Sequence, residues 1–324
     1  MKVGWMKTRF VEFLKRWQLL DAAFYFRFSL WWLLSWTQTS LTHKFRILET
    51  SNSLRNSHNR DTSYGNEFES VSTLLNAIQS KSDFLVDIGA ADGVMASTTM
   101  PLLKKGWQGV LIEGDPHRFR RLAAVSEDWT AVDLVRATVT PTNISTLLNS
   151  LSVPLNVDLV NIDIDSFDLH VVDQMLSGGY RPKLLSMEVN EIIPPEIWFS
   201  VLPTFAYAEA EDHFFGCSLT AAEDVLGRHN YELVGFELNN AFFMPGELVT
   251  RSGLSALSVE EAYTTGYLEH PERDRYFNQS AFFIGLTSDQ GESTFDSLNS
   301  LFQKYHGYYE LRLLRDHEID EGVS

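Results

Sequence analysis

Short apolar runs alternate with helical patterns along the middle of the chain. The apolar runs predict buried strands at residues 84–89, 109–113, 132–139, 157–163 and 184–189. Apolar positions at three- and four-residue spacing predict helices between them, at residues 94–105, 116–126, 143–151 and 167–176. Continuous apolar strands that alternate with helices are typical of a parallel sheet covered on both faces. The pattern therefore predicts an α/β fold with a Rossmann-like sheet.

The alternation of apolar runs and helical patterns ends after residue 190. Residues 193–216 contain prolines and are too long for a simple connection, so we predict a loop that covers the substrate. A helix follows at residues 218–227, with Ser218 as its N-cap. Two strands, 231–237 and 241–244, are close enough for an antiparallel hairpin. The sheet is thus predicted to be mostly parallel with an antiparallel last strand.

The N-terminal segment differs from the rest in charge and in aromatic content. Residues 1–60 carry a net charge of +7 and the remaining residues −24, which together give −17. Apolar and aromatic residues in this segment recur at helical spacing, and its apolar run of 15 residues (22–36) is shorter than the roughly 20 needed to span a bilayer. Tryptophan and cations beside an apolar stripe suit a membrane–water interface.

We therefore predict an amphipathic N-terminal helix that attaches residues 1–40 to a membrane surface, on an otherwise cytoplasmic protein. The alternatives are a helix that packs on the body or on a second copy, and a true signal-anchor. We therefore divide the chain into three segments: a basic aromatic segment and linker (1–65), a cofactor-binding domain (66–246) and a helical extension (247–324). The acidic body repels phosphate backbones, so no nucleic-acid partner is expected. Cys217 is the single cysteine, which excludes a disulfide within the chain.

The turn after the first strand carries the first candidate site, in the segment from Phe84 to Gly93 (FLVDIGAADG). A dinucleotide fold needs Gly-x-Gly-x-x-Gly, with the pyrophosphate on backbone amides. Here the spacing is Gly-x-x-x-Gly, and Asp87 and Asp92 flank the turn. Two carboxylates repel a pyrophosphate and suit the cationic end and sulfonium of S-adenosylmethionine. Glu113, at the end of the second strand, is placed to accept the hydroxyl protons of a ribose.

Acids gather after the fourth and fifth strands. Asp163, Asp165 and Asp168 follow the fourth strand, and Glu188 and Asn190 end the fifth. One or more of these acids could remove a proton from a hydroxyl. A Mg²⁺ held by carboxylates and an amide oxygen is a second interpretation. Helix capping, with Asp165 or Ser166 as N-cap, is a third. We assign Asp163, Asp165 and Glu188 as candidate catalytic residues and assign no metal ligands.

Two histidines have weaker claims. His170 lies within a predicted helix and is interpreted as a packed or solvated side chain. His213 lies in the predicted covering loop, where it could approach a substrate.

Six motifs in this order resemble the FkbM-like methyltransferases, over residues 84–244. They are VDIGAADG (86–93), LIE (111–113), IDID (162–165) with Asp168, LSMEVN (185–190), GCSL (216–219), and YELVG (231–235) with NAFF (240–243). The resemblance implies a Rossmann-like class I methyltransferase fold, S-adenosylmethionine as donor, and O-methylation of a hydroxyl on a sugar or small metabolite.

Carried over by position, the donor loop is Asp87, Gly89, Ala90, Asp92 and Gly93. Glu113 holds the ribose, and Asp163 lies beside the methyl group. The commoner family form after the fourth strand is Asp-Val-Glu-Gly, whereas this chain has Asp-Ile-Asp-Ser at 163–166. The alternative to an active enzyme is a catalytically inactive, methyltransferase-like binding or scaffold protein.

Overall fold

The computed structural model describes residues 65–79, 82–94, 97–205, 213–273 and 292–314. All of the described residues belong to one compact unit. The predicted N-terminal helix and its membrane attachment lie outside the described residues and stay predictions. Among the helices that are described, none combines the length and the apolar character that crossing a bilayer requires.

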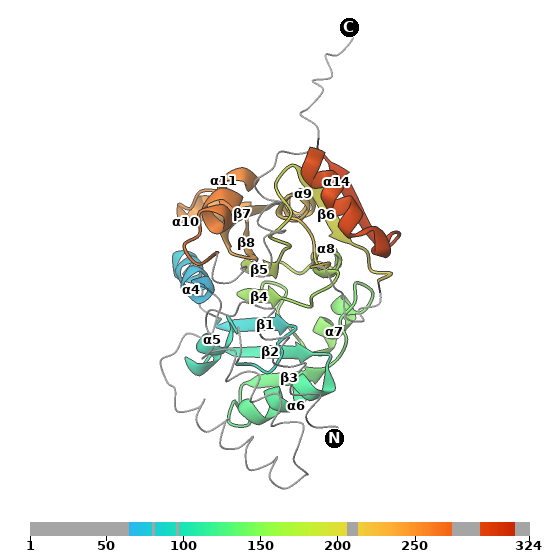
Figure 1. Cartoon of the computed structure of the whole chain (residues 1–324). Helices are drawn as coiled ribbons and strands as arrows, with labels where there is room; N and C mark the ends of the chain where they lie inside the picture. The colour runs from blue at the N-terminus through green and yellow to red at the C-terminus, as the bar shows by residue number, and fades with distance from the viewer. Residues whose placement is uncertain (1–64, 80–81, 95–96, 206–212, 274–291, 315–324) are drawn as a thin grey trace, which may run out of the picture. The chain divides into compact units, whose positions relative to one another are not determined.

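A seven-stranded sheet forms the centre of this unit, in the order β3-β2-β1-β4-β5-β8-β7 (Figure 1). The strands are β1 (Phe84–Ile88), β2 (Gln108–Glu113), β3 (Val132–Arg136), β4 (Leu159–Ile162), β5 (Leu184–Glu188), β7 (Tyr231–Glu237) and β8 (Asn240–Pro245). β1 to β5 pair in parallel, and β8 pairs antiparallel with both β5 and β7. The predicted sheet is confirmed, with the hairpin inserted so that β8 rather than β7 adjoins β5.

Helices cover both faces of the sheet (Figure 1). Helices α7 (Ile144–Ser150), α8 (Asp168–Ser177) and α9 (Leu219–Gly227) pack on one face. Helices α4 (Glu67–Ala77), α5 (Met100–Lys104), α6 (Pro116–Val125) and α10 (Gly246–Ser252) contribute to the core on the other face. The strands alternate between these two cores, as the two-residue period of a strand requires. Val86 and Ile88 join the first core, and Leu85 joins the second.

This alternation places the polar ends of several strands on one face. Leu85, Leu111 and Leu159 face the α4 side, and each is followed two residues later by a polar side chain. Those side chains are Asp87, Glu113 and Asn161. In β5, Glu188 lies four residues after Leu184 and so points to the same face of the sheet. The predicted site residues therefore meet at the carboxyl ends of neighbouring parallel strands, on the face that α4 and α5 cover.

Two predicted segments differ from the structure. The helix expected at 94–105 is only α5, Met100–Lys104, and it begins after a polar turn in which the Ser97 hydroxyl accepts a hydrogen bond from the Met100 amide (3.1 Å). Three consecutive hydroxyl residues, 97–99, compete with helical hydrogen bonding, which explains the late start of α5.

The N-cap of α9 is Ser218 as predicted, and its hydroxyl accepts from the Ala221 amide (3.1 Å).

The segment predicted as a covering loop contains a strand, β6 (Ile197–Val201). β6 pairs antiparallel with β9 (Tyr309–Leu313), so the C-terminal extension is not only helical. Helix α14 (Glu292–Leu301) and the 3-10 turn η2 (Gln303–Tyr305) lie beside these strands around a third core. That core is rich in aromatic rings, including Phe199, Phe214 and Phe302. Helix α11 (Val259–Tyr263) and the π-helical turn η1 (Thr264–Leu268) pack against β7, away from this third core.

Candidate active site

The loop after β1 is built from residues with left-handed backbone. Gly89 has φ +90°, Ala91 +47° and Gly93 +73°. A Cβ on Gly89 would lie 1.7 Å from the backbone oxygen of Asp163, so only glycine lets the ends of β1 and β4 approach this closely. A Cβ on Gly93 would lie 2.5 Å from the side chain of Leu122 in α6. The loop is therefore clamped between the next strand and a helix.

The backbone amides of this loop are used within the protein. The Gly89 and Ala90 amides both donate to the Ile112 carbonyl (2.9 and 3.0 Å), and the Gly93 amide donates to the Ala90 carbonyl (2.9 Å). Side chains take two more, because Glu113 accepts from the Ala91 amide (2.9 Å) and Asp92 from the Val94 amide (3.1 Å). A diphosphate needs such amides, as well as a helix that starts at the loop. The first described helix after the loop starts only at Met100, so the structure does not fit a diphosphate.

Asp87 lies beneath the loop, only 3% exposed. Its two oxygens accept from the Thr99 hydroxyl (2.5 Å) and from the Asn161 amide nitrogen (2.9 Å). Burial raises the pKa of Asp87, the two hydrogen bonds lower it, and repulsion from Glu113 raises it further. Each Asp87 oxygen accepts one hydrogen bond, so Asp87 links the segment before α5 to β4, and each oxygen keeps a lone pair.

Glu113 connects the loop to the turn before α6. One oxygen accepts from the Ala91 amide (2.9 Å) and the other from the Asp115 amide (2.6 Å). A carboxylate oxygen has two lone pairs, so each can still accept a hydroxyl proton. Asp115 in turn caps α6, and its carboxylate accepts from the His117 and Arg118 amides. This cap holds the Glu113 carboxylate at the end of β2.

The three candidate catalytic acids come together. Ligand oxygens of Asp163, Asp165 and Glu188 all lie within 4.8 Å of one another. Burial, followed by repulsion from Asp165 and Asp168, raises the pKa of Asp163. Burial and repulsion from Asp163 raise the pKa of Glu188, and burial raises that of Asp165. Carboxyl groups with raised pKa values are better proton acceptors near neutral pH than ordinary carboxylates.

Asp168 shapes the loop between β4 and α8. Its carboxylate accepts from the Ile164 amide (2.8 Å) and the Ser166 amide (3.1 Å) and is fully buried. The predicted N-caps, Asp165 and Ser166, are wrong: the N-cap position is Phe167, without a side-chain hydrogen bond. Asp165 instead has φ +55°, a left-handed conformation that aspartate tolerates better than most residues. Asp168 thus holds the turn that presents Asp163 and Asp165.

Stability should depend on the ionisation of Asp168. Burial raises its pKa from 3.8 to about 6, so between these values the folded chain binds more protons than the unfolded chain. The free energy of unfolding should therefore fall as pH rises from about 4 to 6, by up to about 3 kcal/mol from this group. Asp168→Asn should remove this contribution, and Asp168→Ala should destabilise by about 2–4 kcal/mol at pH 5 because two amides lose their acceptor.

Urea unfolding of the three proteins between pH 4 and 7 measures both effects. Equal pH slopes for the wild type and Asp168→Asn would contradict the assignment.

Sequence reasoning missed several polar residues at the site. Glu67, at the start of α4, is 2% exposed and accepts from the Thr98 hydroxyl (2.9 Å) and the Asn240 amide nitrogen (2.7 Å). Asn239, in the β7–β8 turn, donates to Glu188 (2.8 Å). The sequence gave no signal that Glu67 would be buried, because its partners Thr98 and Asn240 lie far away in the chain.

The two histidines occupy different surroundings. His170 Nε2 lies 3.3 Å from the Ser200 hydroxyl, and burial lowers its pKa, which fits the packed interpretation. His213 Nε2 lies 2.7 Å from an oxygen of Glu191, a fully buried residue. Burial lowers the pKa of His213, but the Glu191 carboxylate outweighs it and the net shift is upward. Asn190 anchors the same turn by donating to the His213 and Phe215 carbonyls.

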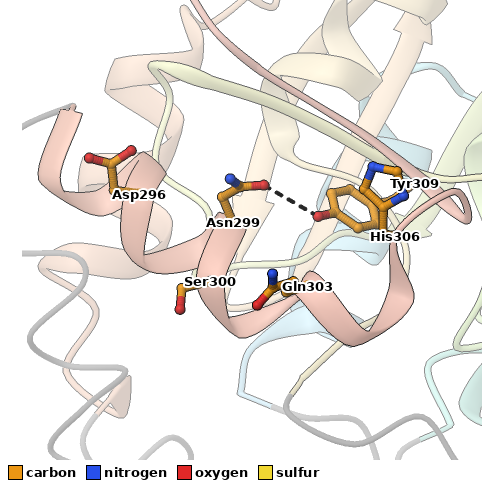
Figure 2. Close-up of a pocket in the computed structure, with 6 residues that line it drawn as sticks. All are labelled: Asp296, Asn299, Ser300, Gln303, His306 and Tyr309. Carbon is orange, nitrogen blue, oxygen red and sulfur yellow. Dashed lines mark hydrogen bonds between the residues drawn. The ribbon is translucent and has the colours of Figure 1, made fainter.

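A separate polar pocket of about 340 Å³ lies on the C-terminal segment (Figure 2). Six residues of α14, η2 and the chain up to β9 line it: Asp296, Asn299, Ser300, Gln303, His306 and Tyr309. The Tyr309 hydroxyl donates to Asn299 at 3.5 Å. None of these residues belongs to the strand ends that carry the site, so this pocket and the candidate active site are distinct.

The strand order defines the fold class. Five parallel strands in the order 3-2-1-4-5, completed by an antiparallel hairpin whose second strand is inserted beside the fifth, give the Rossmann-like fold of class I methyltransferases. No protein-family model and no curated protein matches this chain.

Similar solved structures have low sequence identity. The N-terminal domain of EvdMO1, crystallised in the presence of SAH and D-fucose, is 12% identical, with 56% of this chain and 83% of that chain covered and a TM-score of 0.37. Fibrillarin from Aeropyrum pernix, with natively bound S-adenosyl-L-methionine, is 12% identical (55% and 75% covered, TM-score 0.36). A SAM-dependent methyltransferase from Aquifex aeolicus is 10% identical (60% and 98% covered, TM-score 0.35).

Proposed function

We propose that this chain is an S-adenosylmethionine-dependent O-methyltransferase. The observation that carries the proposal is the set of acceptor side chains at the ends of β1, β2, β4 and β5, all on one face, beside a glycine loop whose own amides are engaged. Such a site offers carboxylates and few amides. It suits a cationic ligand with hydroxyl donors and opposes a diphosphate.

The residues present fit the proposed donor. Gly89, Ala90, Asp92 and Gly93 form a loop that carries no bulky side chain, so a ligand can lie against its backbone. Asp87, at the end of β1, is held by Thr99 and Asn161 and keeps lone pairs for a ligand. Glu113 stands at the end of β2, where its remaining lone pairs can accept the ribose hydroxyl protons. S-adenosylmethionine supplies an electrophilic methyl group on a positively charged sulfur.

The acids after β4 and β5 would serve the acceptor. As the acceptor oxygen bonds to the methyl carbon, the carbon–sulfur bond breaks and its electron pair stays on sulfur. The acceptor proton passes to a carboxylate of the cluster, for which Asp163, Asp165 and Glu188 are the candidates. Much of the acceleration in such an in-line displacement comes from holding the two reactants in register, which rigid strand ends favour.

The acceptor class rests on the sequence resemblance. FkbM-like methyltransferases act on hydroxyls of sugars or natural products, so we propose a sugar or small-metabolite hydroxyl. Four of the six motifs that carry the resemblance lie at the ends of β1, β2, β4 and β5.

Radiolabelled methyl transfer tests the proposal. The purified chain, labelled S-adenosylmethionine and an extract of glycans and metabolites should yield labelled product. Asp163→Asn should lower the rate by about 100-fold, in line with the loss of a general base. Asp133→Asn, at an exposed position of β3, is the control and should leave the rate unchanged. Absence of label from the wild type, with the donor bound, would favour the inactive scaffold protein instead.

We also propose that residues 1–40 attach the chain to a membrane surface. The proposal rests on their basic and aromatic composition. Deleting these residues should abolish flotation with anionic liposomes. Equal flotation of the full chain and the truncated chain would contradict membrane attachment through residues 1–40.

A further inference from the structure

The acids after β4 and β5 are spaced like ligands of a single ion. Asp163, Asp165 and Glu188 each offer one oxygen, and these oxygens lie within 4.8 Å of one another. Oxygen ligands stand at about 2.0–2.6 Å from Mg²⁺ or Ca²⁺, so two ligands of one ion are at most about 5 Å apart. The three oxygens meet the Ca²⁺ limit as they stand, and Mg²⁺, with ligands at about 2.0–2.1 Å, would draw them to within about 4.2 Å of one another.

Glu188 provides a second and separate observation. It is 7% exposed, and Asn239 donates to its Oε1 at 2.8 Å. Its Oε2 is buried and accepts no hydrogen bond from any donor within the described residues. A buried carboxylate oxygen without a donor is unfavourable by several kcal/mol in general. Glu188 belongs to the group of carboxylates that converges with Asp163, so a cation bound by that group would lie beside the Glu188 carboxylate.

Most of the charges around the cluster are negative. The strongest electrostatic influences on Asp163 and Glu188 come from other acids: Asp165, Asp168, Glu67 and Glu191. Arg118 acts on Asp165, but it is exposed on α6. Carboxylates this close need a positive charge or a shared proton between them, and Asp163 and Glu188 are within hydrogen-bond reach of each other. Three oxygen ligands with no nitrogen or sulfur favour Mg²⁺, Mn²⁺ or Ca²⁺ over Zn²⁺.

We propose that Asp163, Asp165 and Glu188 bind one divalent cation, Mg²⁺ or Mn²⁺, at the ends of β4 and β5. The cation would compensate the three carboxylates and leave positions open toward a ligand. Its use in holding an acceptor hydroxyl rests on the proposed function, whereas the binding of the cation does not. The proposal takes up the magnesium interpretation that the sequence left open, and it does not exclude a carboxylate of the cluster as proton acceptor.

Mn²⁺ titration of the chelator-treated full chain, followed by electron paramagnetic resonance and calorimetry at pH 7.5 without donor, tests the proposal. We expect one Mn²⁺ per chain. Asp165→Asn should weaken binding by about tenfold or more, because it removes one charged ligand. Asparagine tolerates the left-handed backbone of residue 165, so this variant should fold. Glu188→Gln should weaken binding similarly, and Asp296→Asn, exposed on α14, should bind as the wild type does.

Two results would overturn the proposal: no stoichiometric Mn²⁺ binding at millimolar concentration, or equal affinity of the wild type, Asp165→Asn and Glu188→Gln. Thermal melts of each variant with and without Mn²⁺ check folding, and only the wild type and Asp296→Asn should show a clear upward shift. Mn²⁺ binding without methyl transfer would leave the cation site standing and reject the proposed function. Methyl transfer that is unaffected by chelator, without Mn²⁺ binding, would reject the cation site and leave the proposed function standing.

Discussion

Gly89→Ala should destabilise the fold by about 4 kcal/mol or more and abolish ligand binding at the strand ends. The added Cβ would lie 1.7 Å from the Asp163 backbone oxygen, and residue 89 has φ +90°, which side-chain-bearing residues rarely adopt. Backbone strain of this kind is unfavourable by about 1–3 kcal/mol, and the overlap adds at least as much. The overlap also pushes the β4 end, with Asp163, away from the loop.

Gly179→Ala is the matched control for that variant. Gly179 has φ +91°, almost the same as Gly89, but a Cβ there would meet nothing within 4 Å. It should therefore lose only about 1–2 kcal/mol. Urea denaturation of both variants separates backbone strain from the overlap with Asp163. Equal losses for the two variants would show that β1 and β4 do not approach each other as described.

Glu113→Ala should weaken the binding of S-adenosylmethionine by about 100-fold. It removes a charged acceptor that faces the proposed ribose, and hydrogen bonds to charged groups contribute about 1.5–3 kcal/mol each. It also frees the Ala91 and Asp115 amides, which are held at 2.9 and 2.6 Å, so the loop loses its link to β2.

Glu113→Gln and Asp133→Ala are the companion variants for this experiment. Glu113→Gln keeps one acceptor oxygen and should bind with intermediate affinity, whereas Asp133→Ala on β3 should bind like the wild type. Circular dichroism and a thermal melt confirm that each variant is folded before calorimetry. Unchanged donor affinity in folded Glu113→Ala would show that Glu113 does not contact the donor.

The local patterns that define the central sheet could be predicted from sequence. Mostly apolar runs such as Phe84–Ile88 predict strands from short-range pattern alone, and Ser218 caps α9 through a contact three residues away. Non-local pairings could not be predicted in this way. β6 pairs with β9, and Val201 lies opposite Tyr309, more than 100 residues later in the chain. Periodicity carries no information about a partner at that distance.

The same distinction applies to the site. Asp163, Asp165 and Glu188 were predicted because each follows an apolar strand, and parallel strands bring their carboxyl ends to one edge. The hydrogen-bond partners of Asp87 were not predicted, because Thr99 and Asn161 reach it from two other segments.

Calorimetry of the wild-type chain with S-adenosylmethionine, S-adenosylhomocysteine and NAD is the most direct test of the central claim, that the strand ends suit a sulfonium nucleoside and not a diphosphate. The site described here should bind the first two at one per chain and should not bind NAD detectably. Comparable binding of NAD, or no binding of either S-adenosyl compound by the folded chain, would contradict it.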